Sequence, residues 1–148
     1  MNETQLDWIF YLNLDDKIGT NFLLLDHALK PKQISLIPLQ MDQLLGFIKE
    51  KKTVFVIVNV SNMRSKTLFE EKGKKIVQYL LRNTNFNIIH ISSFDEEQYS
   101  AVFRNTNNYL FVKLPVGVDN VAKTIAKFYL DHKEQKNLWT FGKTKHVG

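Results

Sequence analysis

Polar residues follow several apolar runs of this chain, at places where side chains of different strands could act together. They are two aspartates, an asparagine, a serine and a lysine: Asp15, Asp16, Asn59, Ser92 and Lys113. Paired carboxylates bind divalent cations such as Mg²⁺, and a lysine ammonium pairs with anions such as phosphate. Asn59 carries a neutral carboxamide, which is a poor nucleophile. The set therefore predicts a cation or anion site whose central residue does not react.

The elements that would position these residues are short strands rich in branched and aromatic side chains. The pattern predicts strands over Trp8–Leu14, Ile34–Leu39, Val54–Val58, Asn87–Ile91 and Tyr109–Val112. Val54–Val58 is the most apolar run and does not alternate, so we expect it at the centre of a parallel sheet with both faces covered. Pro38 cannot donate a ladder hydrogen bond, which indicates a sheet edge or a strand end.

Between the strands, apolar residues recur at spacings of three and four, as in amphipathic helices. The predicted helices are Lys17–Lys30, Met41–Ile48, Leu68–Leu81, a segment around Asp95–Phe103, and Val121–Leu130. Leu23–Leu25 is also compatible with a strand. Five strands alternating with five helices predict a three-layer α/β/α fold, a doubly wound parallel sheet of flavodoxin-like type. Ligands of such sheets bind at the carboxyl ends of the strands, near the point where strand order reverses.

Composition limits the protein classes to be considered. At 148 residues, with 44% hydrophobic and 24% charged residues, the chain suits one globular domain. We assign residues 1–134 to this domain and 135–148 to a basic tail or linker, beyond which a further domain could follow. Cysteine is absent, no secretory signal pattern is found, and no apolar run approaches the ~20 residues that span a bilayer. We therefore expect a cytoplasmic protein without a membrane segment.

The net charge of +5 comes mainly from lysines. They cluster in Lys49–Lys52, Lys72–Lys75 and the tail Lys133–Lys145. Clustered arginines and interleaved aromatic residues are missing, so this pattern favours solvated helix faces over a nucleic-acid site. The glycines are isolated and form no phosphate-binding loop. His90 lies among isoleucines in a predicted strand, which is typical of a core histidine rather than a catalytic one.

From Asp7 to about Glu134 the chain resembles the receiver domain of bacterial two-component response regulators. The most similar stretch begins at Ser92, continues through the acidic helix start at Asp95 and ends with Lys113 near Pro115. In that family an acidic pair binds Mg²⁺ and an aspartate ending strand three accepts a phosphoryl group. A serine or threonine ending strand four senses the phosphate, and a lysine directly before a proline pairs with it. The resemblance assigns these positions to Asp15 and Asp16, Asn59, Ser92 and Lys113, in that order.

Two departures from the family pattern argue against phosphotransfer. Asn59 stands where the acceptor aspartate is expected, and a carboxamide cannot form an acyl phosphate. Its neutrality also leaves Asp15 and Asp16 as a weak Mg²⁺ site, so no cofactor is required. In addition, Leu114 separates Lys113 from Pro115. Because successive side chains of a strand point to opposite faces, either Lys113 or Leu114 faces the pocket, and the sequence leaves this open.

The resemblance implies a pseudo-receiver signalling module that is not an enzyme and acts through contacts with proteins. The partner would be another protein, a linked output domain or a second copy of the chain. Four aromatic residues mark the expected contact face, although packing under the helices is an alternative: Tyr99, Phe103, Phe111 and Tyr129. Two further hypotheses are a small-ligand or divalent-cation sensor on the same scaffold and, third, a basic nucleic-acid-binding domain.

Overall fold

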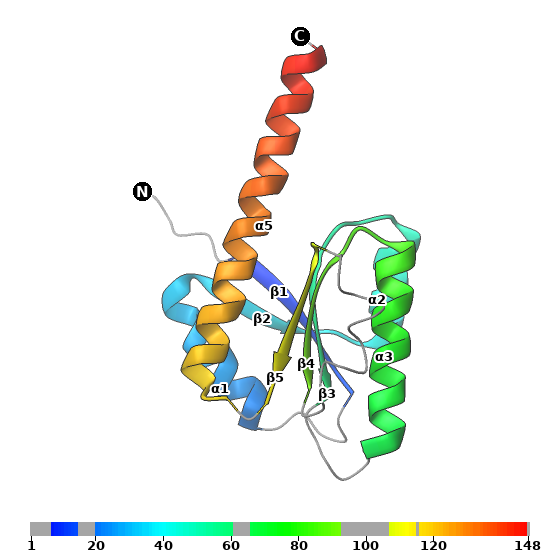
Figure 1. Ribbon diagram of the computed structural model, residues 1–148, viewed down its shortest axis with the longest axis vertical. Helices are drawn as coiled ribbons and strands as arrows, with labels where there is room; N and C mark the ends of the chain where they lie inside the picture. The colour runs from blue at the N-terminus through cyan, green and yellow to red at the C-terminus, as the bar shows by residue number, and fades with distance from the viewer. Residues whose placement is uncertain (1–6, 15–19, 61–65, 93–106, 115, 148) are drawn as a thin grey trace.

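The computed structural model describes residues 7–14, 20–60, 66–92, 107–114 and 116–147 (Figure 1). Their strands form a single five-stranded sheet in which every neighbouring pair is parallel. The strands are β1 (Asp7–Asn13), β2 (Ile34–Pro38), β3 (Phe55–Val60), β4 (Asn87–Ser92) and β5 (Tyr109–Lys113). All five lie close to the predicted positions, which confirms the assignment of strands from the sequence.

The strand order is β2-β1-β3-β4-β5, so the winding direction reverses between β1 and β3. This order is the flavodoxin-like one, and it confirms the doubly wound α/β/α prediction. The residues from Val56 to Val60 in β3 are all buried, as expected for a central strand covered on both faces. Pro38 is the last residue of β2, which is an edge strand, so its predicted place is confirmed.

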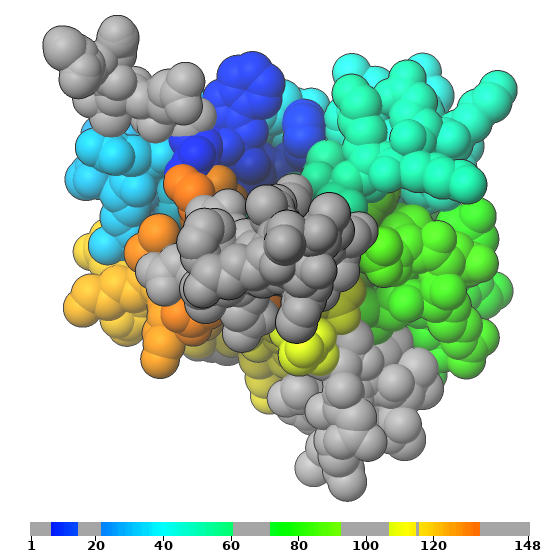
Figure 2. All heavy atoms as spheres, turned by 90° about the horizontal axis from the view of Figure 1, so that it is seen from above, coloured from blue at the N-terminus to red at the C-terminus, as the bar shows by residue number. Residues whose placement is uncertain are grey.

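Helices cover both faces of the sheet. They are α1 (Thr20–Leu29), α2 (Met41–Lys49), α3 (Lys66–Asn83) and α5 (Val118–Val147). Seen from above, α1 and α5 lie on one side of the strands and α2 and α3 on the other (Figure 2). Leu23–Leu25 belongs to α1, so the strand alternative is wrong there, and a 3₁₀ turn containing Pro31 follows the helix. The helix predicted around Asp95–Phe103 lies outside the described residues.

Alternating strand residues supply two separate hydrophobic cores. Beneath α1 and α5, Ile57 and Ile89 pack with Ile125 of α5. Beneath α2 and α3, Val58 and Ile88 pack with residues of α3 such as Leu80. Successive side chains of a strand point to opposite faces of the sheet, so every second residue of a strand packs against the same helix layer. Among the described residues, no helix is both long and apolar enough to cross a membrane.

Helix α5 is longer than the sequence indicates. The sequence predicts a helix over Val121–Leu130 and a tail or linker over residues 135–148, but α5 runs from Val118 to Val147 and projects beyond the sheet (Figure 1). The prediction of the helix end was wrong because apolar periodicity reports a face that packs. Continuation of a helix requires only residues that do not break it, and lysine, glutamate and glutamine are good helix formers. The division of the chain at residue 134 stays a prediction.

Candidate functional site

Asn59 lies in the interior at the carboxyl end of β3, beside the point where strand order reverses. The residue is 3% exposed. Its side-chain Nδ2 donates a hydrogen bond of 2.8 Å to Oδ1 of Asn13, its register partner at the end of β1. The Leu14 amide donates to the Asn59 carbonyl oxygen at 3.0 Å, which continues the ladder past the carboxamides. Two neutral amides therefore face each other where a flavodoxin-like sheet keeps its ligand.

Asn13 is a site residue that the sequence did not point to. The aspartates that follow the strand are the more conspicuous residues, whereas Asn13 precedes them in the apolar run Leu12-Asn13-Leu14. Its signal was present, because a polar residue near the end of a buried strand requires a hydrogen-bond partner. That the partner is Asn59 follows only from the pairing of β1 with β3.

The question of which residue of β5 faces Asn59 is answered by the register. Ser92 of β4 pairs with Lys113, and the Leu114 amide donates to the Ser92 carbonyl oxygen at 2.8 Å. Leu114 packs against the core beneath α1 and α5 and lines a cavity with Asn59. Lys113 is exposed. It lies two residues after Phe111 and so on the same face of β5, and Phe111 packs beneath α2 and α3. Leu114, not Lys113, thus lies on the face of the sheet that Asn59 occupies and lines the same cavity.

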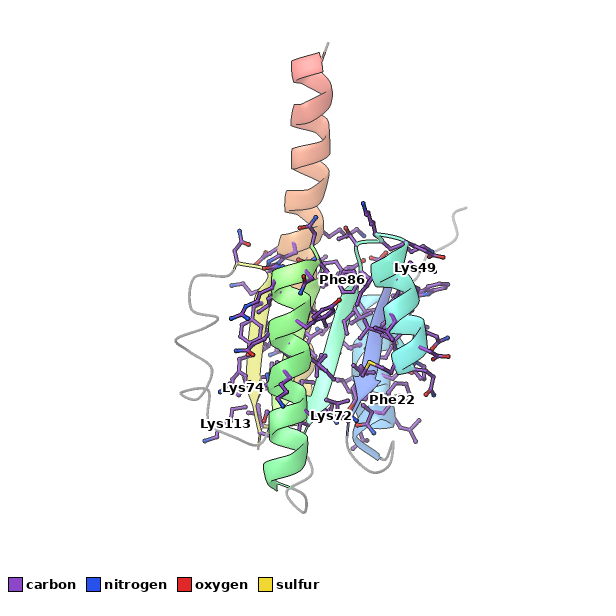
Figure 3. All side chains as sticks on the ribbon, turned by 90° about the vertical axis from the view of Figure 1, so that its right-hand side faces the viewer. Phe22, Lys49, Lys72, Lys74, Phe86 and Lys113 are labelled. Atoms are coloured by element: carbon purple, nitrogen blue, oxygen red, sulfur yellow. The ribbon has the colours of Figure 1, made fainter. Side chains whose placement is uncertain are left out.

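Ser92 is fully buried, but it does not share a face of the sheet with Asn59. Its register partner on β3 is Val60, whose side chain belongs to the core beneath α2 and α3. His90 precedes Ser92 by two residues in β4, so its side chain lies on the same side of the sheet. Figure 3 views this layer and labels Lys72 and Lys74 on α3 and Lys113 at the end of β5. The structure therefore does not bring Ser92 and Lys113 to the face that Asn59 occupies.

His90 is a core residue, as the sequence predicted. It is 0% exposed, and its Nδ1 lies 3.3 Å from the Tyr109 hydroxyl. The Phe111 ring stands edge-on to the imidazole, with ring centroids 5.5 Å apart. Burial lowers the pKa of His90 from 6.5 to about 4, because the charged form would lose its hydration. The imidazole is neutral at pH 7 and serves packing.

Asp15 and Asp16 lie outside the described residues, so the weak Mg²⁺ site assigned to them stays a prediction. Within the described ranges, no group of three or more histidines, cysteines, aspartates and glutamates is close enough to hold a metal ion.

The expected aromatic contact face needs a correction. Tyr99 and Phe103 lie outside the described residues, but Tyr129 is only 7% exposed, and its ring lies 4.5 Å from that of Phe55. Burial and the neighbouring carboxylate of Asp7 raise the pKa of the Tyr129 phenol. Tyr129 is therefore a core residue of α5, and its assignment to a docking face was wrong. Phe111 is half-buried against His90, which agrees with packing as its main role.

A cavity of about 70 Å³ adjoins Asn59 on the α1 and α5 side of the sheet. Its lining comes from the middle of α1, the first turns of α5 and the carboxyl-terminal parts of the strands. Nine described residues line it: Tyr11, Leu24, Leu25, Asn59, Ile91, Leu114, Val116, Val118 and Val121. None of the nine carries a charge. Apart from the Asn59 carboxamide and the Tyr11 hydroxyl, the lining side chains are aliphatic.

Comparison with known proteins finds a similarity of fold but none of sequence family. No protein-family model matches the chain, and no curated protein matches it by sequence. Among solved structures, the chain is similar to the crystal structure of a response regulator from Thermotoga maritima, with a TM-score of 0.54 and 11% sequence identity. The match covers 83% of this chain and 97% of the other. Together with the strand order, this similarity shows that the chain has a receiver-like, flavodoxin-type α/β fold.

Proposed function

We propose that this chain is a receiver-like signalling module that accepts no phosphoryl group and acts by contacting other proteins. The observation that carries the proposal is the Asn59 carboxamide, which is 3% exposed and bonded to Asn13 where the acceptor carboxylate of a receiver would stand. An amide oxygen is neutral and cannot form the acyl phosphate that a carboxylate forms. Leu114, instead of a lysine, lines the cavity that Asn59 adjoins, so among the described residues β5 supplies no cation to a phosphate on that face.

Phosphorylation is tested directly by incubating the protein with acetyl phosphate and Mg²⁺ and recording its intact mass. We expect the mass of the wild-type chain to stay unchanged, while a receiver domain with an acceptor aspartate gains one phosphoryl group under the same conditions. The matched variant is Asn59→Asp, which restores only the carboxylate. A phosphoryl adduct on the wild-type chain, at Asp15, Asp16 or any other carboxylate, would show that the proposal is wrong.

The contact that transmits the signal is proposed to involve α5, with a second copy of the chain as the partner. This helix runs from Val118 to Val147, and its carboxyl-terminal part extends past the sheet (Figure 1). Helices in proteins are stabilised mostly by the packing of one face, so a projecting segment gains stability when it packs against another helix. Protein partners of other kinds fit the same geometry but have no separate support. Catalytic activity is not part of the proposal, and the cytoplasmic location stays a prediction.

Sedimentation equilibrium tests this dimer. We expect the full chain to sediment as a dimer at micromolar concentrations and a chain truncated after Lys133 to sediment as a monomer. The truncation removes none of the described residues of the two hydrophobic cores, the last of which is Tyr129. A full chain that remains monomeric, or a truncated chain that still dimerises, would exclude α5 as the dimer contact.

A further inference from the structure

We propose that the cavity beside Asn59 is a binding site for a neutral small molecule that has a branched hydrocarbon body and one hydroxyl or amide group. This inference goes beyond the proposed signalling role, because it assigns a ligand to the domain. It does not depend on how the domain contacts its partners.

The cavity has a buried floor and a half-exposed rim. Tyr11, Asn59 and Ile91 are each no more than 4% exposed and come from three neighbouring strands. At the rim, Leu24 of α1 is 48% exposed and Val116, which precedes α5, is 44% exposed. Contact of aliphatic side chains with water at a cavity mouth is unfavourable, and a bound apolar group would remove this contact. The arrangement resembles a small ligand pocket more than an internal packing defect, which would have no open side.

The lining chemistry selects a neutral ligand. A charged ligand would lose its hydration among aliphatic side chains without meeting an opposite charge in the lining, and this loss is costly. The Asn59 carboxamide both donates and accepts hydrogen bonds, so it can exchange them with a ligand hydroxyl or amide. A receiver pocket with an acidic acceptor and a lysine would favour an anion bridged by a cation. Here Asn59 and Leu114 stand at those two positions, and none of the described residues that line the cavity is charged.

The volume limits the size of the ligand. A cavity of about 70 Å³ is several times the ~10–15 Å³ that one water-sized probe occupies, which leaves room for about five non-hydrogen atoms. A four-carbon branched alcohol meets this limit. The location also agrees with the general position of ligands in doubly wound sheets, because Tyr11 and Asn59 belong to β1 and β3, between which the strand order reverses.

The test is a titration of the full chain with 2-methylpropan-1-ol, followed by amide chemical shifts. We expect shifts clustered at Leu25, Asn59, Ile91 and Val121 that saturate with a dissociation constant of about 1–10 mM, a value common for so small a ligand. Protonated 2-methylpropan-1-amine has the same shape and a positive charge, and we expect at least tenfold weaker binding from it. Nuclear Overhauser effects from the alcohol methyl groups to Val118 and Val121 would place the ligand in the cavity.

The matched variants are Leu114→Lys, which introduces a charge into the cavity lining, and Leu130→Lys, which makes the same change at an exposed position of α5 outside it. We expect only the first to abolish binding. Absence of saturable shifts in the wild-type chain, equal binding of the ammonium analogue, or Overhauser effects to residues away from the cavity would overturn the assignment. If Leu114→Lys does not fold, the Overhauser contacts in the wild-type chain decide. The absence of phosphoryl transfer is tested separately by intact mass. Binding of the alcohol, or its failure to bind, therefore does not affect that result.

Discussion

Acidification from pH 7 to pH 4 is expected to lower the free energy of unfolding by about 3 kcal/mol through His90 alone. Burial holds the pKa of this imidazole at about 4 in the folded chain, against 6.5 when it is hydrated. Between these two values the unfolded chain binds a proton that the folded chain does not. Stability therefore rises with pH across this window and shows no contribution from His90 above it.

Urea unfolding at a series of pH values measures this contribution, and a variant isolates it from the titration of carboxylates. His90→Gln keeps a hydrogen-bonding group near the Tyr109 hydroxyl but cannot take up a proton. We expect its unfolding free energy to change less between pH 7 and pH 4 than that of the wild-type chain. His27→Gln, at an exposed position of α1, is the control and should retain the wild-type dependence. Equal dependence in all three proteins would show that His90 is not the responsible group.

Replacement of Gly73 by alanine is expected to destabilise the protein by about 1–2 kcal/mol, although alanine favours helices by about 1 kcal/mol. Gly73 is a buried residue of α3 where the helix lies against β3. An added Cβ would lie 2.7 Å from Cγ2 of Val60, which is 0% exposed. The side chain of a β-branched residue is stiff, so Val60 cannot turn away and the helix must move from the sheet. Leu14 and His90 adjoin the same position.

Gly46→Ala supplies the matched control, because Gly46 lies within α2 and nothing would approach its added Cβ within 4 Å. We expect a gain of about 0.5–1 kcal/mol from helix propensity alone. The two substitutions are chemically identical and should shift the thermal midpoint in opposite directions, by about 2–4 °C per kcal/mol. A stabilising Gly73→Ala would mean that α3 does not lie this close to β3.

The fold was accessible from the sequence because its strands are separate apolar runs between amphipathic stripes. The unbroken run at Val54–Val58 indicated a strand covered on both faces, and Pro38 indicated an edge or a strand end. Each of these is a local property of the chain. General rules of βαβ connection indicated a doubly wound sheet with its ligand site near a reversal of strand order, but the reversal between β1 and β3 was seen only in the structure.

The detailed site was less accessible, because it depends on which strands pair and in which register. The sequence alone could not choose between Lys113 and Leu114, since a shift of one residue exchanges the faces of a strand. The pairing of Ser92 with Lys113 made the choice. The partnership of Asn13 with Asn59 joins residues 46 positions apart, and no local pattern indicates it. Tyr129 has the residue type of a contact surface, but the packing of α5 against Phe55 buries it.

Helix α5 joins two distant parts of the molecule. Val118 and Val121 in its first turns line the cavity beside Asn59, and the same uninterrupted helix continues to Val147. At 1.5 Å per residue, its 30 residues measure about 45 Å. The first turns of the helix therefore adjoin the cavity, and most of its length lies beyond it. A tilt of about 5° there would displace its far end by about 4 Å, more than the ~3 Å between the donor and acceptor of a hydrogen bond.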